Sequence, residues 1–142
     1  MRRLARDRRG AAAVEFAVTT LTFLILVMGM VDLGRLFSAE HALNLGVIKA
    51  ARYAVVHGSS SSSPSSPSST TAVQSAFTAA VTPVLGAADA QSCTVTVTYA
   101  GSSNAPGSQV TVQASYSWAP MTTIAHFAAI TLTAQAVGTI QN

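Results

Sequence analysis

Near its N-terminus the chain has a long apolar run that follows a cluster of charged residues. From Ala11 to Val31, a stretch of 21 residues, the only ionisable side chain is that of Glu15. As a helix this stretch would be about 31 Å long, close to the hydrocarbon thickness of a bilayer. The pattern therefore predicts a membrane-spanning helix with one carboxylate near its start.

Beyond Asp32 the apolar positions become periodic, which predicts that the same helix continues to about Val56 with one face against other parts of the fold. Lys49 and Arg52 lie opposite that face. The face consists of five apolar residues at helical spacing, namely Leu36, Leu43, Val47, Ala50 and Ala54. Three glycines are candidate bends of the helix, namely Gly29, Gly34 and Gly46. Asp32 and Arg35, one turn apart, are expected to form a solvated ion pair.

A serine-rich segment follows, from Gly58 to Thr71, with nine serines, two prolines and no charge. This composition predicts a flexible linker with a coil-like reach of about 20 Å. Thr71 is the expected N-cap of a short helix. Pro83 is expected to end or kink that helix, and Gly86 to close it.

The C-terminal part alternates apolar and polar residues in three stretches, which is the pattern of half-buried strands. The predicted strands are Cys93–Tyr99, Val110–Trp118 and Ile130–Ala136. A hairpin loop is expected between the first two strands, and a crossing loop or single turn between the last two. The fold class is therefore α+β: a long N-terminal transmembrane and amphipathic helix, a short second helix, and a small antiparallel sheet of about three strands laid on the first helix.

Charge is concentrated at the N-terminus, where five arginines occupy the first nine residues, namely Arg2, Arg3, Arg6, Arg8 and Arg9. From Ala54 onward the only formal charge is Asp89. The basic isoelectric point thus describes a short tail, and no basic stripe is available for nucleic acid. Arginines before an apolar span orient the N-terminus toward the cytoplasm and the rest of the chain to the far side of the membrane.

The sequence offers little for catalysis or metal binding. Cys93 is the only cysteine, so it has no partner for an intramolecular disulfide and cannot contribute to a cysteine-rich zinc site. Cys93 and His126 could be nominated as a nucleophile and a base, but Cys93 falls on the predicted apolar face of a strand. We therefore expect no enzymatic activity, no cofactor and no metal.

The glutamate in the apolar run lies on a distinct helical face. A carboxylate at the bilayer centre costs about 2.5–3.5 kcal/mol, and less near the end of a span. Glu15 begins a stripe of polar and small residues at steps of four and three, formed by Glu15, Thr19, Thr22, Leu26 and Gly29. Such a stripe lets another helix approach closely, so it is expected to face protein.

The residues around this glutamate resemble the processing site of type IV prepilins. In this chain "RRG" is followed by "AAAVEF". The resemblance implies cleavage between Gly10 and Ala11, with Glu15 as the fifth and Phe16 as the sixth residue of the mature chain. It also implies that the new N-terminal amine is methylated and that Glu15 pairs with the amine of a neighbouring subunit. Such a pair would leave both charges unsatisfied in a misregistered subunit.

The closer resemblance is to the TadE-like pseudopilins of the tight-adherence (Tad/Flp) pilus system. It rests on "RGAAAVEFA", on the "LGR" at Leu33–Arg35 and on the "AARYAV" at Ala50–Val55, and it covers roughly the first 57 residues. It implies a pilin-like fold with a cleaved basic leader at residues 1–10. The remaining parts would be a transmembrane segment at 11–31, an extracytoplasmic helix at 32–57, a linker at 58–71 and an ectodomain at 72–142.

The resemblance further implies a structural minor pilin of the bacterial inner membrane, with a single span and an extracytoplasmic C-terminus, that acts in assembly of a Tad-type pilus for surface adhesion. Its partners would be a prepilin peptidase, other pilins or pseudopilins, the Tad inner-membrane assembly proteins and the lipid bilayer. Two alternatives remain open at this stage. One is an uncleaved, membrane-anchored extracytoplasmic binding module, and the other is a secreted protein whose first segment is discarded.

Overall fold

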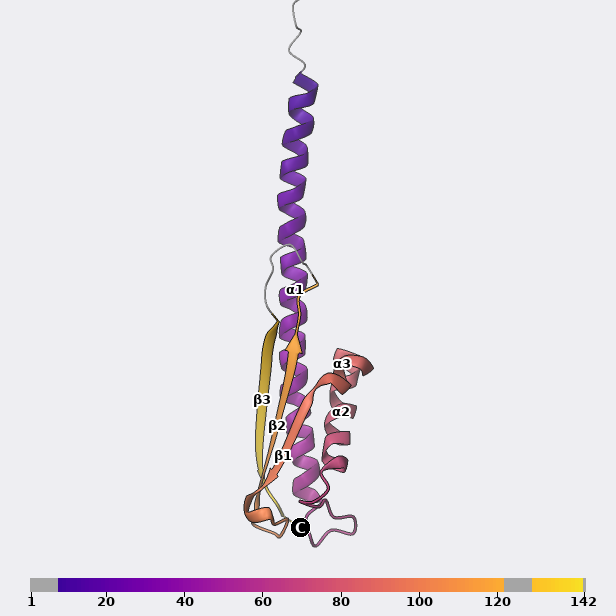
Figure 1. Ribbon diagram of the computed structural model, residues 1–142, viewed down its shortest axis with the longest axis vertical. Coiled ribbons are helices and arrows are strands. Elements are labelled where there is room, and N and C mark those ends of the chain that lie inside the picture. Colours follow the sequence, from indigo (N-terminus) through magenta and orange to yellow (C-terminus); the bar gives the residue numbers. More distant parts are fainter. Residues whose placement is uncertain (1–7, 122–128, 142) are drawn as a thin grey trace, which may run out of the picture.

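One helix runs the length of the molecule, and a small α+β unit is built around its C-terminal half (Figure 1). The computed structural model describes residues 8–121 and 129–141. The elements follow in the order α1 (Arg8–Val56), α2 (Thr71–Leu85), α3 (Ala87–Ser92), β1 (Thr94–Tyr99), the 3-10 turn η1 (Ala100–Ser102), β2 (Gln109–Trp118) and β3 (Ile130–Thr139). The α+β fold class predicted from the sequence is confirmed.

Helix α1 is continuous over 49 residues, including the three glycines where the sequence had left a bend open. Its periodic half forms the centre of the core, as predicted. The buried face there consists mainly of small residues, namely Ala39, Ala42, Leu43, Val47, Ala50, Ala51 and Ala54. Lys49 and Arg52 are exposed on the opposite side, as their positions in the helical pattern predict.

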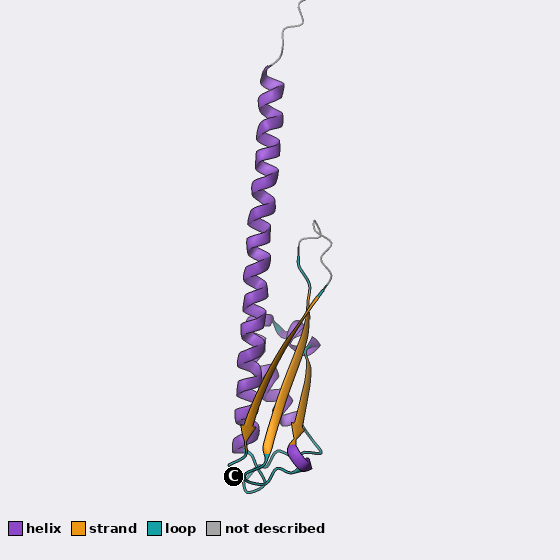
Figure 2. Ribbon diagram, turned by 90° about the vertical axis from the view of Figure 1, so that its left-hand side faces the viewer, coloured by secondary structure: helices purple, strands orange, loops and turns teal. Residues whose placement is uncertain are grey.

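The sheet is antiparallel with the order β1-β2-β3, and its apolar face lies on α1 (Figure 2). In the register Val97 pairs with Val112 and Val112 with Ala136, so apolar residues line up across the sheet on one face. The predicted alternation is therefore confirmed. The observed bounds differ slightly, because β1 begins at Thr94 and β3 continues to Thr139.

Helix α2 packs beside α1 and also reaches β1. The contact with α1 is close at Gly46, where a Cβ atom would lie 2.6 Å from Val81 Cγ1 and 2.7 Å from Phe77 Cε2. Both of those side chains are fully buried. Gly46 therefore serves close helix packing.

The ends of α2 differ in part from the prediction. Thr71 is the first helical residue and Thr70 is the N-cap, which makes no side-chain capping bond, so the expected role of Thr71 is wrong. Pro83 lies inside the last turn and the helix continues past it to Leu85. Gly86 closes the helix as predicted, with a φ of 87° and its N–H donated to the Thr82 carbonyl.

The serine-rich segment, which the composition predicts to be a flexible linker, is fastened to the fold at Ser65. Ser65 is buried, and its hydroxyl donates to the His57 carbonyl and accepts from the Tyr99 hydroxyl. The Asn104 side-chain amide also donates to the Ser65 carbonyl. A buried hydroxyl and carbonyl with three protein partners hold this loop at the end of the ectodomain.

Candidate assembly and membrane site

The N-terminal half of α1 makes no packing contact that buries it. From Gly10 to Val31 every side chain is exposed except that of Thr20, which is partly covered. This half extends well beyond the sheet and α2 (Figure 2). Among the described residues α1 is the one helix long and apolar enough to cross a membrane, and none of its apolar window is buried. A large apolar surface of this kind needs a bilayer or protein partners to cover it.

The predicted cleavage position lies at the start of α1. Helix α1 begins at Arg8, so Gly10 and Ala11 both lie in its first turns. The space around Gly10 is open, since an added Cβ would meet no other atom within 4 Å. Gly10 and Ala11 as a cleavage site stay a prediction.

The polar stripe is entirely exposed, and its hydroxyl groups are already engaged. The Thr19 hydroxyl donates to the Glu15 carbonyl at 2.9 Å, and the Thr22 hydroxyl donates to the Val18 carbonyl at 3.0 Å. Each hydroxyl oxygen can still accept a hydrogen bond. The stripe therefore presents acceptors, the Glu15 carboxylate and the two hydroxyl oxygens, rather than free donors. Glu15, Phe16, Thr19 and Thr22 as assembly residues stay predictions.

Sequence reasoning missed a second feature at the outer end of the span. Asp32 is only 7% exposed, and its Oδ1 accepts a hydrogen bond from the Met121 backbone N–H at 3.1 Å. The same oxygen lies 3.5 Å from an Arg35 guanidinium nitrogen. The expected solvated pair is thus wrong for Asp32, which joins α1 to the end of β2. A charged residue next to an apolar span was the only signal, because its partner lies 89 positions away.

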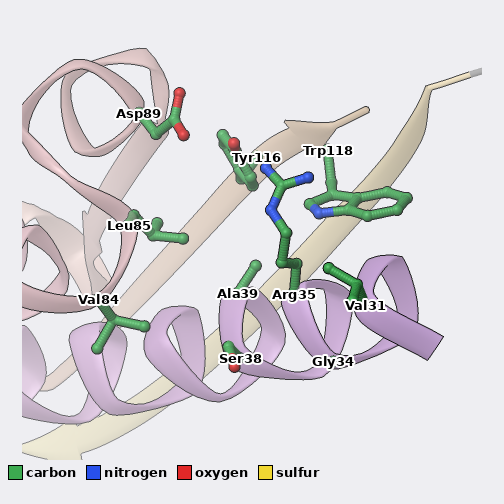
Figure 3. A pocket seen from close by; sticks show the side chains of 10 residues that line it. All are labelled: Val31, Gly34, Arg35, Ser38, Ala39, Val84, Leu85, Asp89, Tyr116 and Trp118. Atoms are coloured by element: carbon green, nitrogen blue, oxygen red, sulfur yellow. The ribbon is translucent and has the colours of Figure 1, made fainter. Parts of the chain in front are cut away.

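Beside this junction α1, α2, α3 and β2 enclose a groove of about 500 Å³ (Figure 3). Arg35 rises from α1 toward Tyr116 and Trp118, while Asp89 on α3 lies beyond Tyr116. Burial and then the Asp89 carboxylate raise the pKa of Tyr116. The tyrosine hydroxyl therefore stays protonated at neutral pH and has no character of a catalytic base.

Cys93 is equally unsuited to nucleophilic chemistry. Burial and then the Asp89 carboxylate raise the pKa of its thiol, and the thiol donates to the Asp89 carbonyl. Nucleophilic cysteines need the opposite shift. His126, its nominated partner, lies outside the described residues. Within residues 8–121 and 129–141, no group of three or more His, Cys, Asp and Glu side chains is placed to hold a metal.

By its fold and its exposed apolar surface the chain is an α+β protein with one long apolar N-terminal helix that fits a single-pass membrane anchor. A family model described as TadE-like protein then matches residues 10–52. The resemblance inferred from the motifs is thereby confirmed over that segment. Over these residues the chain is similar to that family. No curated protein and no solved structure matches the chain.

Proposed function

We propose that the protein is a minor pilin or pseudopilin of a Tad-type system. It is inserted in the bacterial inner membrane through residues 11–31, with the N-terminus cytoplasmic, and is processed between Gly10 and Ala11 by a prepilin peptidase. It then takes part in assembly of a pilus used for surface adhesion. The observation that supports this most is the exposed apolar half of α1 with its one carboxylate, inside the segment that matches the TadE-like family.

The carboxylate has a specific task in this proposal. The ammonium group of a neighbouring processed chain brings N–H donors and a positive charge into the apolar bundle. Glu15 offers a carboxylate and Thr19, one turn further, offers a hydroxyl oxygen whose own proton is already donated within the helix. These groups together satisfy the ammonium, and the pair is stable only when the two subunits are in register.

Processing is tested by replacing the residue before the cleaved bond. Gly10→Leu should abolish maturation, because a peptidase subsite that accepts glycine has no room for a branched side chain. Gly34→Leu is the matched control, since it makes the same substitution where the helix surface is also open. Intact-mass analysis of the membrane fraction should give a chain starting at Ala11 for the wild type and Gly34→Leu, and an uncleaved chain for Gly10→Leu. A wild-type chain that keeps Met1 would instead support the uncleaved binding module, and one that begins beyond Val31 would support the secreted protein.

Pairing is tested at Glu15 in a strain that makes pili. Glu15→Ala should insert in the membrane at least as well as the wild type, while piliation falls roughly tenfold or more, because the neighbour's ammonium is left unpaired in an apolar setting. Glu40→Ala, which removes an exposed glutamate from the other half of the same helix, should leave piliation unchanged. Normal pilus numbers with Glu15→Ala would contradict the pairing role and leave the processing result standing.

A further inference from the structure

The described residues that adjoin the ends of β2 and β3 nearest the membrane span are apolar and mostly exposed, and we call them the tip. Its described residues are 119–121 and 129–130, and none of them is charged or polar: Ala119, Pro120, Met121, Ala129 and Ile130. The Met121 side chain is 72% exposed and that of Ile130 is 44% exposed. Along the rest of these strands the outward-facing residues are polar except Val137, so the tip differs from the outer face of the sheet.

The tip is held at a defined height along α1. The hydrogen bond from the Met121 N–H to Asp32 fixes it to the residue that follows the predicted span. Trp118 pairs with Ile130 at the same end of the sheet. The apolar tip therefore lies where α1 would leave the hydrocarbon layer.

Between the tip and α1 runs a second groove of about 500 Å³, which shares Trp118 with the groove of Figure 3. Its lining is almost wholly apolar and includes Ile25, Leu26, Met30 and Leu33 of α1, with Trp118 and Ile130 of the sheet. Several of these α1 residues belong to the predicted span itself. The groove is thus continuous with the helix surface that a bilayer would cover.

We propose that this tip is a second membrane contact: it sits in the outer leaflet, and a phospholipid acyl chain fills the groove. The inference rests on the proposed function only in requiring that α1 spans the membrane. Trp118 would then lie at the interfacial depth that tryptophan favours. Arg35, whose side chain is 42% exposed, lies at the level of the lipid phosphates, to which its charge is complementary.

The length of the groove suits a hydrocarbon chain. It follows α1 from residue 25 to residue 36, a rise of about 17 Å, so an extended acyl chain can lie along it.

Trp118 is the only tryptophan in the chain and lines both this groove and the groove of Figure 3, so its fluorescence reports on the end of the sheet where the two grooves meet. The full chain is reconstituted at low protein density in liposomes of phosphatidylethanolamine and phosphatidylglycerol, in which a fraction of the lipid is brominated either near the headgroup or near the chain end. We expect loss of Trp118 emission with both lipids, and a greater loss with the shallow bromines. Met121→Ser and Ile130→Ser should each reduce the loss, whereas Val137→Ser, on the exposed face of β3 away from the tip, should not.

The outcomes separate this inference from the proposed function. A chain that does not float with the liposomes would overturn both, because α1 would not be a membrane span. A chain that floats but whose Trp118 emission is unaffected by brominated lipid would overturn only the proposed membrane contact of the tip. In that case quenching by aqueous acrylamide would assign the groove to water, and protection from acrylamide would assign it to a second copy of the chain.

Discussion

The two halves of α1 have the same backbone and opposite surroundings. In the N-terminal half, residues 11–31, nearly every side chain is exposed, and the apolar residues include many large ones. In the C-terminal half, from Ala39 to Ala54, one face is fully covered by the sheet and α2. The second half is therefore stabilised by its own chain, whereas the first requires an apolar environment that the chain does not supply.

Side-chain size separates the halves as clearly as burial does. The covered face of the C-terminal half is dominated by alanine, which lets β2, β3 and α2 come close to the helix axis on two sides. The exposed half has leucine, phenylalanine and methionine where the covered half has alanine. Bulk suits a surface that meets lipid, while small residues suit a helix at the centre of a small core.

The largest difference in the free energy of unfolding is expected between a phenylalanine removed from the covered part of the fold and one removed from the exposed half of α1. Phe77→Ala removes a fully buried ring that packs against α1 and should lower the free energy of unfolding of the ectodomain by about 3–5 kcal/mol. Phe23→Ala, on the exposed half of α1, should leave that free energy unchanged. Denaturant unfolding of the full chain in detergent, followed by near-ultraviolet circular dichroism, measures both. Equal losses would show that the two halves unfold as one unit.

A smaller difference is expected when one methyl group is added to a glycine in the covered part of α1 and to another in open space. Gly46→Ala would place a methyl group 2.6 Å from Val81 and should cost about 1–3 kcal/mol through overpacking. Gly34→Ala adds the same methyl in open space and should stabilise the helix by roughly 0.5–1 kcal/mol. The pair is measured by thermal unfolding. A neutral Gly46→Ala would mean that α2 can move away from α1 at little cost.

The sequence was informative where a regular pattern had one physical cause. Alternation predicted three strands because each has one face toward the core that the sheet forms with α1 and α2. An apolar run with a single glutamate predicted the exposed half of α1. Contacts between distant residues were not accessible in this way. The Asp32 to Met121 bond joins residues 89 apart, and the burial of Ser65 depends on Tyr99 and Asn104. A composition of serine and proline predicts a coil, and three tertiary hydrogen bonds override it.

The smallest expected effect concerns pH. Tyr116 and Cys93 both have a pKa raised by burial and by Asp89, from ordinary values of 10.0 and 9.0. Folding thus favours their protonated forms, and this contribution is fully present below the ordinary pKa values and is lost as pH rises through the raised ones. The ectodomain should therefore lose stability above about pH 9. The exposed half of α1 has no ionisable residue between Glu15 and Asp32, so it should keep its helical signal in detergent. Thermal unfolding at a series of alkaline pH values measures this, and Tyr116→Phe with Cys93→Ser should make the ectodomain curve flatter. An equally steep curve in the double variant would assign the alkaline loss to other groups of the ectodomain.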